Sequence, residues 1–330
     1  MEITEKQYLS GLDIWKFAMA VLIVAAHCQF LEETTVYGYM EKLESIAVPC
    51  FFAISAFLFF RRIYSIPPNE NSSSYLWHTL KRLAILFCAW YVLVLPITYI
   101  RFYSVATLKE VVFAWCLTQT AQGYWFIKAL IYNTLLFYVC RKTILLWVIT
   151  IVGWLSYLYL SYNYIYHFNP VIERLSPYYS FYYHIAYFSV GVWIAKYPEW
   201  VEKCSSKIIV FFIIIWLSIF ICLEEWLSPL YRLLSFPLLF PVFYSMRRGN
   251  PQVCSTLRKM SIILYMVQFA LIWLYNEGCK LWFEADSTPF IVLQYSITRF
   301  AVILSLSVVI ALLILKFEKK PHLAFLKYLH

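Results

Sequence analysis

Apolar runs of about twenty residues follow one another along the chain, and they constrain its fold more than any other feature. A run of this length can cross the hydrocarbon core of a bilayer as a helix. Only helices and closed barrels span lipid, because every backbone polar group needs an internal partner there. The runs lack the ten-residue alternation of barrel strands. We therefore predict an all-α polytopic membrane protein.

The composition agrees with this class of protein. Of the 330 residues, 62% are hydrophobic and 14% charged, whereas soluble domains have roughly 25% charged residues. Many aromatic residues stand near the ends of the runs, as in the interfacial belts of membrane proteins. We predict about ten transmembrane helices in one bundle, which form a single domain over residues 1–330. The expected spans are 11–31, 43–62, 80–100, 123–141, 143–161, 179–196, 207–223, 229–246, 259–277 and 290–316.

Two segments are assigned outside this pattern of spanning helices. Residues 105–120 are too short and too polar for a span, so we expect an interfacial helix there. Residues 63–79, which include SIPPNENSSS, are interpreted as a linker-like loop within the same domain. The first apolar run lacks a small-residue cleavage site, and this favours a signal anchor over a removed signal peptide.

The placement of lysine and arginine predicts the orientation. If the N-terminus is cytoplasmic, the cytoplasmic segments hold 19 of the 27 basic residues. The opposite loops hold few, and some are acidic, as in LEETTVYGYMEKLE and NEGCKLWFEAD. Cytoplasmic loops carry the excess of basic residues in membrane proteins. Both termini are therefore expected in the cytoplasm, with the protein in the plasma (inner) membrane as a multi-pass protein.

Charge and cysteine content argue against other classes of function. The net charge of +9 gathers in alternate loops and forms no groove-reading patch, so no nucleic acid partner is expected. The nine cysteines are scattered singly, without a CxxC pair or a metal-ligand spacing. Cysteines of this kind behave as small buried hydrophobes. A disulfide framework and a metal site are therefore not expected.

The opening run, GLDIWKFAMAVLIVAAHCQF, carries three ionisable residues on one helical stripe. Lys16 and His27 are eleven residues apart, which is about three turns plus 20° and roughly 16 Å along a helix. Asp13 lies one turn before Lys16. Ionisable groups within a span normally face a polar cavity or a partner. The alternative is an Asp–Lys pair that anchors the helix end, together with a hydrogen-bonded core histidine.

The stretch LDIWKFAMAVLIVAAH resembles the first helix of the membrane-bound acyltransferase family 3, the OafA/WecH-like O-acyltransferases. That helix carries an aspartate, a basic residue three positions later, and a histidine eleven beyond that. Here these positions hold Asp13, Lys16 and His27, with lysine where arginine is usual. The second run, VPCFFAISAFLFFRR, is similar to another element of the family, with Ala56 at the usual glycine.

Four further stretches resemble family elements in the same order. They are YLWHTLKRLAILFCAWY, GYWFIKALIYNTLLFYV, YYHIAYFSVGVWIA and KMSIILYMVQF. In the last of them Gln268 stands where a histidine is common. The ordered set covers nearly the whole chain and is specific, although each element alone is a weak signal.

The resemblance implies acyl transfer from cytoplasmic acyl-CoA, usually acetyl-CoA, to a hydroxyl of a cell-envelope glycan or its lipid-linked precursor. Acyl-CoA is then a co-substrate, and no permanently bound cofactor is expected. Histidine titrates in the range that suits a general base for a sugar hydroxyl. His27 is the expected base, and the predicted catalytic group also includes Asp13 and Lys16, which are expected to hold the donor mouth and fix the helix. His184 is the reserve candidate, whereas His78, His167, His322 and His330 are interpreted as loop, interfacial or tail residues.

Other site residues follow from charge and position. The phosphates of the donor call for cations at the cytoplasmic face, where Arg82 ranks first, followed by Lys81. Lysine, arginine and polar groups inside spans suit a polar cavity or bridge helices, and aromatic faces suit sugars. The expected acceptor-binding or cavity-lining residues are Tyr124, Trp125, Lys128, Ser55, Tyr265, Gln268 and Arg299.

Two other functions remain open. A secondary transporter or glycan-lipid flippase would use His27 as a proton relay, although we see no inverted repeat and only seven glycines. An inactive acyl-CoA-binding partner is suggested by the departures at Lys16, Ala56 and Gln268, but Asp13 and His27 are retained. Capsule, exopolysaccharide, lipopolysaccharide and lipid-linked acceptors all fit the sequence, as do acetyl and succinyl donors.

Overall fold

A computed structural model describes residues 9–67, 70–98, 124–169, 179–222, 224–246, 249–283 and 288–330. Within these ranges every regular element is a helix, which confirms the predicted all-α class. The interfacial helix predicted at 105–120 lies outside the described residues.

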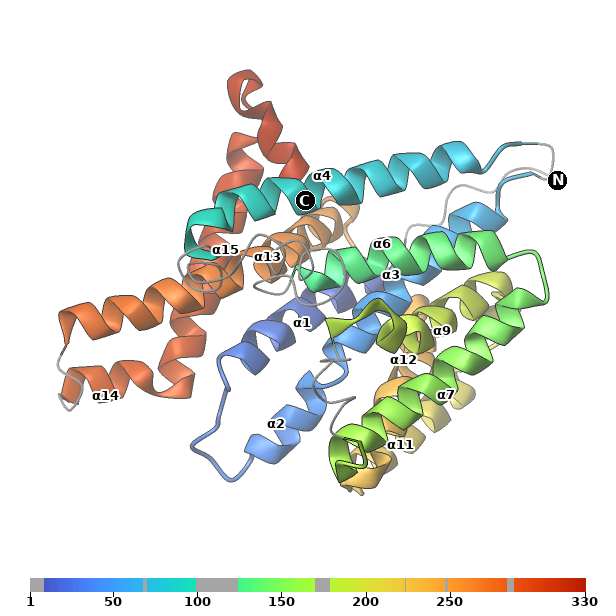
Figure 1. The fold of residues 1–330 in the computed structure, drawn as a ribbon, viewed down its shortest axis with the longest axis horizontal. Coiled ribbons are helices and arrows are strands. Elements are labelled where there is room, and N and C mark those ends of the chain that lie inside the picture. The colour runs from blue at the N-terminus through green and yellow to red at the C-terminus, as the bar shows by residue number, and fades with distance from the viewer. Residues whose placement is uncertain are drawn as a thin grey trace.

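The longer helices are spread over the whole chain (Figure 1). They are α1 (Ser10–His27), α3 (Ala47–Tyr64), α4 (Ser73–Thr98), α6 (Trp125–Cys140), α7 (Leu145–Tyr166), α9 (Ile185–Lys196), α11 (Ser206–Ile221), α12 (Ser228–Ser245), α13 (Pro251–Trp282) and α15 (Ser296–Phe317). The shorter helices are α2 (Tyr37–Glu44), α10 (Glu199–Glu202), α14 (Thr288–Gln294) and the 3₁₀ helices η4 (Phe181–His184), η5 (Glu225–Leu227) and η6 (Pro321–Leu329).

Among the described residues, six helical segments are long and apolar enough to cross a membrane. They are α1, the segment Tyr37–Tyr64 that holds α2 and α3, α4 as far as Val94, α7, α13 and α15. Two shorter apolar helices, α6 and α11, accompany them. The remaining two predicted spans, 179–196 and 229–246, coincide with η4–α9 and α12. The apolar helices are those of a multi-pass membrane protein.

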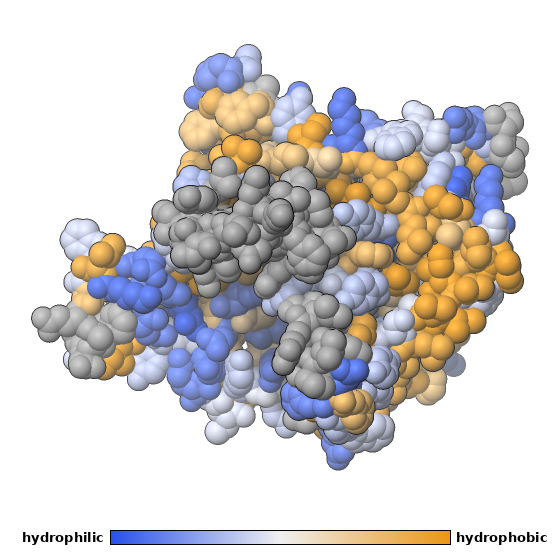
Figure 2. Space-filling view, in the orientation of Figure 1, coloured by the Kyte–Doolittle hydropathy of each residue, from blue (hydrophilic) through white to orange (hydrophobic). Residues whose placement is uncertain are grey.

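The surface supports this assignment, because many large apolar side chains are exposed. Val139, Ile144 and Leu155 are 70%, 72% and 63% exposed, respectively. Figure 2 shows a broad hydrophobic surface on the side of the molecule where α7 lies. A patch of this extent on a protein of this class is covered by lipid.

Helix α3 lies in the core, and its packing against α9 is close. The side chains of Phe52, Phe57 and Phe60 are almost completely buried. A Cβ atom added to Gly191 of α9 would lie 2.0 Å from the carbonyl oxygen of Ala53 and 2.9 Å from the Cβ of Ala56. Small residues permit such a close approach of helices in membranes.

Helices α1 and α13 pack side by side and run in the same direction. Asp13 of α1 contacts Arg258 of α13 near one end of the pair. Near the other end, the ring of His27 lies 4.4 Å from that of Phe269, measured between centroids. Helix α4 crosses this part of the bundle (Figure 1). It also holds the end of the chain, since the indole N–H of Trp90 donates to the carbonyl oxygen of Leu329 at 3.0 Å.

Several predicted boundaries are wrong: α13 (Pro251–Trp282) extends beyond both ends of the span predicted at 259–277, and two others have local causes. The loop expected at 63–79 ends early, because α4 begins at Ser73, whose backbone N–H donates to the side-chain oxygen of Asn71 at 2.9 Å. The single span expected at 290–316 is divided into α14 and α15 at Tyr295. There Glu33 accepts the backbone N–H of Ser296 at 2.7 Å and so caps the start of α15.

Candidate functional site

A cavity of about 350 Å³ lies among α1, α3, α4, α6 and α13. Three basic side chains line it, namely Lys16, Arg82 and Arg258, together with His78. Hydroxyl groups also line it, from Ser55, Tyr75, Thr79, Thr134, Ser261 and Tyr265. Basic groups are rare inside membrane bundles and normally face cavities or pathways. This concentration of cations makes the cavity the candidate site.

One carboxylate accompanies the basic groups. Asp13 Oδ2 lies 3.7 Å from Nη1 of Arg258, with side-chain exposures of 6% for Asp13 and 44% for Arg258. Lys16 interacts electrostatically with Asp13, Arg258 and Arg82. Asp13 thus offsets part of the positive charge, and the group as a whole remains cationic.

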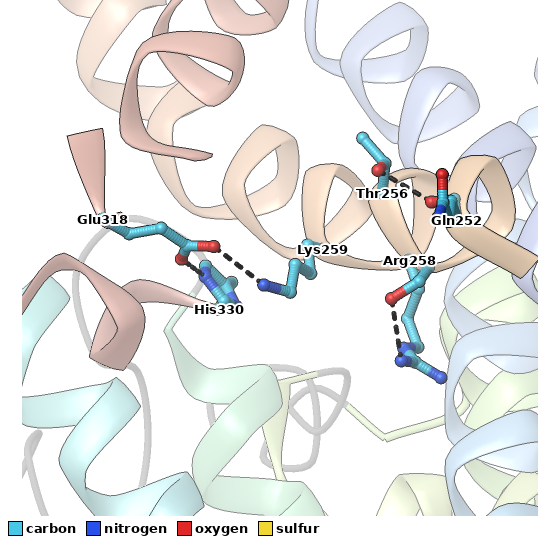
Figure 3. A network of polar contacts seen from close by, with 7 residues as sticks. Gln252, Thr256, Arg258, Lys259, Glu318 and His330 are labelled. Atoms are coloured by element: carbon cyan, nitrogen blue, oxygen red, sulfur yellow. Dashed lines mark hydrogen bonds and ion pairs between the residues drawn. The ribbon is translucent and has the colours of Figure 1, made fainter. Parts of the chain in front are cut away.

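Two consecutive basic residues of α13 point in different directions: Arg258 lines the cavity, and Lys259 does not. The N-cap residue of this helix is Asn250, whose side chain accepts the backbone N–H groups of Gln252 and Val253 at 2.9 and 3.4 Å. In Figure 3, Lys259 points toward Glu318 and His330, whereas Arg258 points away from them.

The chain after α15 is held at this end of α13 by ionic contacts. Nζ of Lys259 lies 2.9 Å from Glu318, which also contacts the His330 ring. Partial burial raises the pKa of Glu318, but the hydrogen bonds from His330 and Lys259 outweigh it and hold this pKa below its usual value. Lys259 is therefore engaged in an ion pair with Glu318, in the segment after α15.

Helix α4 presents one face to the cavity. Tyr75, His78, Thr79 and Arg82 recur at intervals of three and four residues, which places them on one side of a helix. His78 was interpreted as a loop residue, and its role in the lining was missed. Its spacing of four residues from Arg82 was the available signal.

Aromatic rings form the opposite end of the cavity. The Phe126 centroid lies 6.0 Å from that of Phe51 and 5.3 Å from that of Tyr265. Tyr124, at the start of α6, is buried nearby, and its hydroxyl lies 3.5 Å from the carbonyl oxygen of Met266. Of the predicted cavity residues, Ser55 and Tyr265 thus line the cavity.

His27 lies beyond this end. Helix α1 is continuous from Ser10 to His27, so Lys16 and His27 share a face, as predicted from their spacing. The cavity described above is lined by Lys16 but not by His27, so the expectation that both line one cavity stays a prediction. His27 is exposed and packs on Phe269, one helical turn past Tyr265.

Arg299 fixes the end of α1 beside His27. Its Nε and Nη2 atoms donate to the carbonyl oxygen of Cys28 at 3.1 and 2.6 Å, and Nη2 also contacts the side-chain oxygen of Gln29 at 3.2 Å. A cation is favourable at a helix C-terminus. In the adjacent loop, hydrogen bonds from Ser296 lower the pKa of Glu33. Arg299 thus positions the helix end that carries His27.

The remaining predicted residues lie outside the cavity lining. Trp125 packs on His184, whose other stacking partner is Phe52, with centroid distances of 4.9 and 4.4 Å. Gln268 is buried, and its amide donates to the carbonyl oxygen of Tyr265 at 3.1 Å. Lys128 is half-buried on α6, and Lys81 is exposed on α4.

Comparison with known proteins gives one match. A family model described as an acyltransferase domain, that of acyltransferase family 3, matches residues 9–316. No curated protein and no solved structure matches the chain. The matched range includes every described residue that lines the cavity, as well as His27 and Arg299.

Proposed function

Since the chain belongs to acyltransferase family 3, we propose that it is a membrane O-acyltransferase. It moves an acyl group, in the first place acetyl, from acyl-CoA to a hydroxyl of a cell-envelope glycan or a lipid-linked glycan precursor. The observation that carries this proposal is the cavity in which Lys16, Arg82 and Arg258 come together among apolar helices.

The donor end of the reaction is assigned to this cavity because acyl-CoA carries several phosphates. Charge-assisted hydrogen bonds from lysine and arginine are the usual means of holding such groups. Arg82 and Lys16 supply the fixed charge, and Arg258 adds a third cation held by Asp13. We place this end of the bundle at the cytoplasmic face of the plasma membrane, where acyl-CoA is found and where basic residues collect.

The acceptor end is assigned to His27. In the proposed reaction His27 takes the proton of the acceptor hydroxyl as its oxygen attacks the thioester carbonyl carbon. The carbon–sulfur bond then breaks, and the coenzyme A thiolate leaves and receives a proton. A general base of this kind contributes about 10²- to 10⁴-fold in rate. Arg299 acts indirectly, since it holds the helix end that carries this histidine.

The test compares neighbouring basic residues on α4. Both residues are exposed, but only Arg82 lines the cavity. Binding of coenzyme A to purified protein in detergent should weaken at least tenfold in Arg82→Ala and stay within twofold in Lys81→Ala. Higher ionic strength should weaken binding to the wild-type protein by screening. Equal effects of the two substitutions would remove the cavity as the donor site.

The reaction itself is tested by mass spectrometry of the acceptor. Cells that carry the wild-type gene should give envelope glycans with an added acyl group, and those with His27→Ala should not. The His27→Ala protein should still bind coenzyme A. A flippase or transporter with His27 as a proton relay would instead leave glycan acylation unchanged while glycan export fails, and this result would refute the acyltransferase.

A further inference from the structure

A second concave region lies on the opposite part of the bundle, among α7, α9 and α12. It is a groove of about 580 Å³ lined by four tryptophans, Trp147, Trp154, Trp193 and Trp200, and by aliphatic side chains that include Leu155 and Leu233. None of its lining residues belongs to the cationic cavity. The proposed reaction makes no use of this groove.

Two of the indole N–H groups in the groove wall are bonded within the protein. The indole N–H of Trp193 donates to the Thr150 hydroxyl at 2.9 Å, and that hydroxyl donates to the carbonyl oxygen of Leu146 at 2.8 Å. The indole N–H of Trp154 likewise donates to the hydroxyl of Ser189 at 2.8 Å. With these groups satisfied, the wall offers ring faces and aliphatic carbons. Such a wall suits a hydrocarbon chain and not a polar ligand.

The groove opens toward the surroundings of the bundle. Trp147 and Leu155 are 50% and 63% exposed, and both belong to α7, which is long and apolar enough to cross a membrane. The side of the molecule that carries α7 is broadly hydrophobic (Figure 2). Whatever enters the groove therefore comes from the bilayer.

One end of the groove carries a positive charge. Nζ of Lys196 lies 5.1 Å from the ring centroid of Trp193 and 5.7 Å from that of Tyr197, and both rings line the groove. Within the described ranges Lys196 forms no salt bridge.

Other charged groups near this end are engaged or point into solvent. Lys203 pairs with Glu199 at 3.7 Å, with both side chains 79% exposed. Glu202 accepts a hydrogen bond from Tyr244 at 3.3 Å. Lys207 is exposed on the first turn of α11. Among the described charged residues named here, Lys196 is thus available to a ligand in the groove.

We propose that this groove binds an anionic phospholipid, with an acyl chain along the tryptophans and the headgroup phosphate against Lys196. An apolar slot with a cation at one end matches an amphiphile whose headgroup is anionic. A basic residue near a membrane surface increases the affinity for anionic lipid about fivefold, the equivalent of about 1 kcal/mol. The site is independent of acyl transfer.

The test is native mass spectrometry of the full chain in detergent with phosphatidylglycerol or phosphatidylcholine of identical acyl chains. Wild-type protein should bind one phosphatidylglycerol about fivefold more tightly than phosphatidylcholine. Lys196→Gln should abolish this preference, whereas Lys203→Gln, the matched control, should retain it. Leu155→Trp, which fills the slot, should weaken binding of both lipids.

Three results would overturn the proposal. Equal affinity for the two lipids in the wild-type protein would remove the headgroup site. Loss of preference in Lys203→Gln as large as in Lys196→Gln would indicate diffuse surface charge instead of a site. If the wild-type protein forms dimers that dissociate in the Leu155→Trp variant, a second copy of the chain, and not lipid, covers the groove. Variants are compared only where their helical circular dichroism equals that of the wild type.

Discussion

The ion pair between Asp13 and Arg258 is expected to be the main electrostatic link between α1 and α13. The spacing of charges in the sequence suggests Asp13 and Lys16 as partners, but the structure brings in an arginine 245 residues away. Two unit charges 3.7 Å apart interact by about 4.5 kcal/mol at an effective dielectric constant of 20 and by about 1.1 kcal/mol in bulk water. Because Arg258 is 44% exposed while Asp13 is buried, we expect about 2 kcal/mol.

A double-mutant cycle measures this energy. The four proteins are wild type, Asp13→Asn, Arg258→Gln and the double variant, and their thermal unfolding is followed in one detergent at low salt. Each single substitution should destabilise the protein, and the double variant should be less destabilised than the sum. A second cycle with Asp13→Asn and Lys16→Gln should give a smaller coupling energy.

The expected coupling between Asp13 and Arg258 is refuted by a small measured coupling energy. A coupling energy below about 0.5 kcal/mol for Asp13 and Arg258, the usual limit of additivity for independent sites, would mean that solvent screens the pair completely. A larger coupling for Lys16 than for Arg258 would restore the local pairing expected from the sequence. Coenzyme A binding gives an independent check, because Asp13→Asn removes negative charge and should not weaken it by electrostatics alone.

Two further predictions concern the ends of the bundle. Glu318→Gln should lower thermal stability at pH 7 through loss of the contacts to Lys259 and His330. Because the folded-state pKa of Glu318 is lowered, this difference from wild type should be present above pH 4.5 and fade as the pH falls further. A constant difference down to pH 3 would contradict it. Arg299→Ala should cost about 1.5 kcal/mol, the lower end for charged hydrogen bonds, and should reduce acyl transfer while coenzyme A binding stays unchanged. Weaker coenzyme A binding would place Arg299 at the donor cavity instead.

Local features of the sequence predicted the class of fold and part of the site. Apolar runs of spanning length define most of the helices without reference to their neighbours. Lys16 and Arg82 interrupt such runs, and the cost of a charge there marks them as cavity residues. The angle between Lys16 and His27 also follows from helix geometry alone. These are properties of single segments.

The missed features depend on contacts between distant segments or on turn chemistry. Arg258 is one of many basic residues in the sequence, and only tertiary packing brings it to Asp13. The polar stretch before His78 is typical of a linker and so predicts a loop. In the structure, however, the side chain of Asn71 accepts the backbone N–H of Ser73, the first residue of the helix that contains His78. The break at Tyr295 depends on Glu33, which comes from the loop after α1. None of these partners can be identified from one segment.

On the proposed function, the separation of the donor and acceptor ends favours a long donor. Lys16 and His27 lie eleven residues apart on one face of α1, about 16 Å along its axis. Arg258 and Phe269 are also eleven residues apart on the adjacent helix, which runs in the same direction, so both walls have the same length. A donor whose phosphates lie at the Lys16 end must carry its acyl group across that distance. Acyl-CoA does so through the pantetheine arm between its phosphates and its thioester, whereas an acyl phosphate has no such arm. On the proposed function, the rings of Phe51, Phe126 and Tyr265 stand where that arm must pass, so their packing controls access of the thioester to His27.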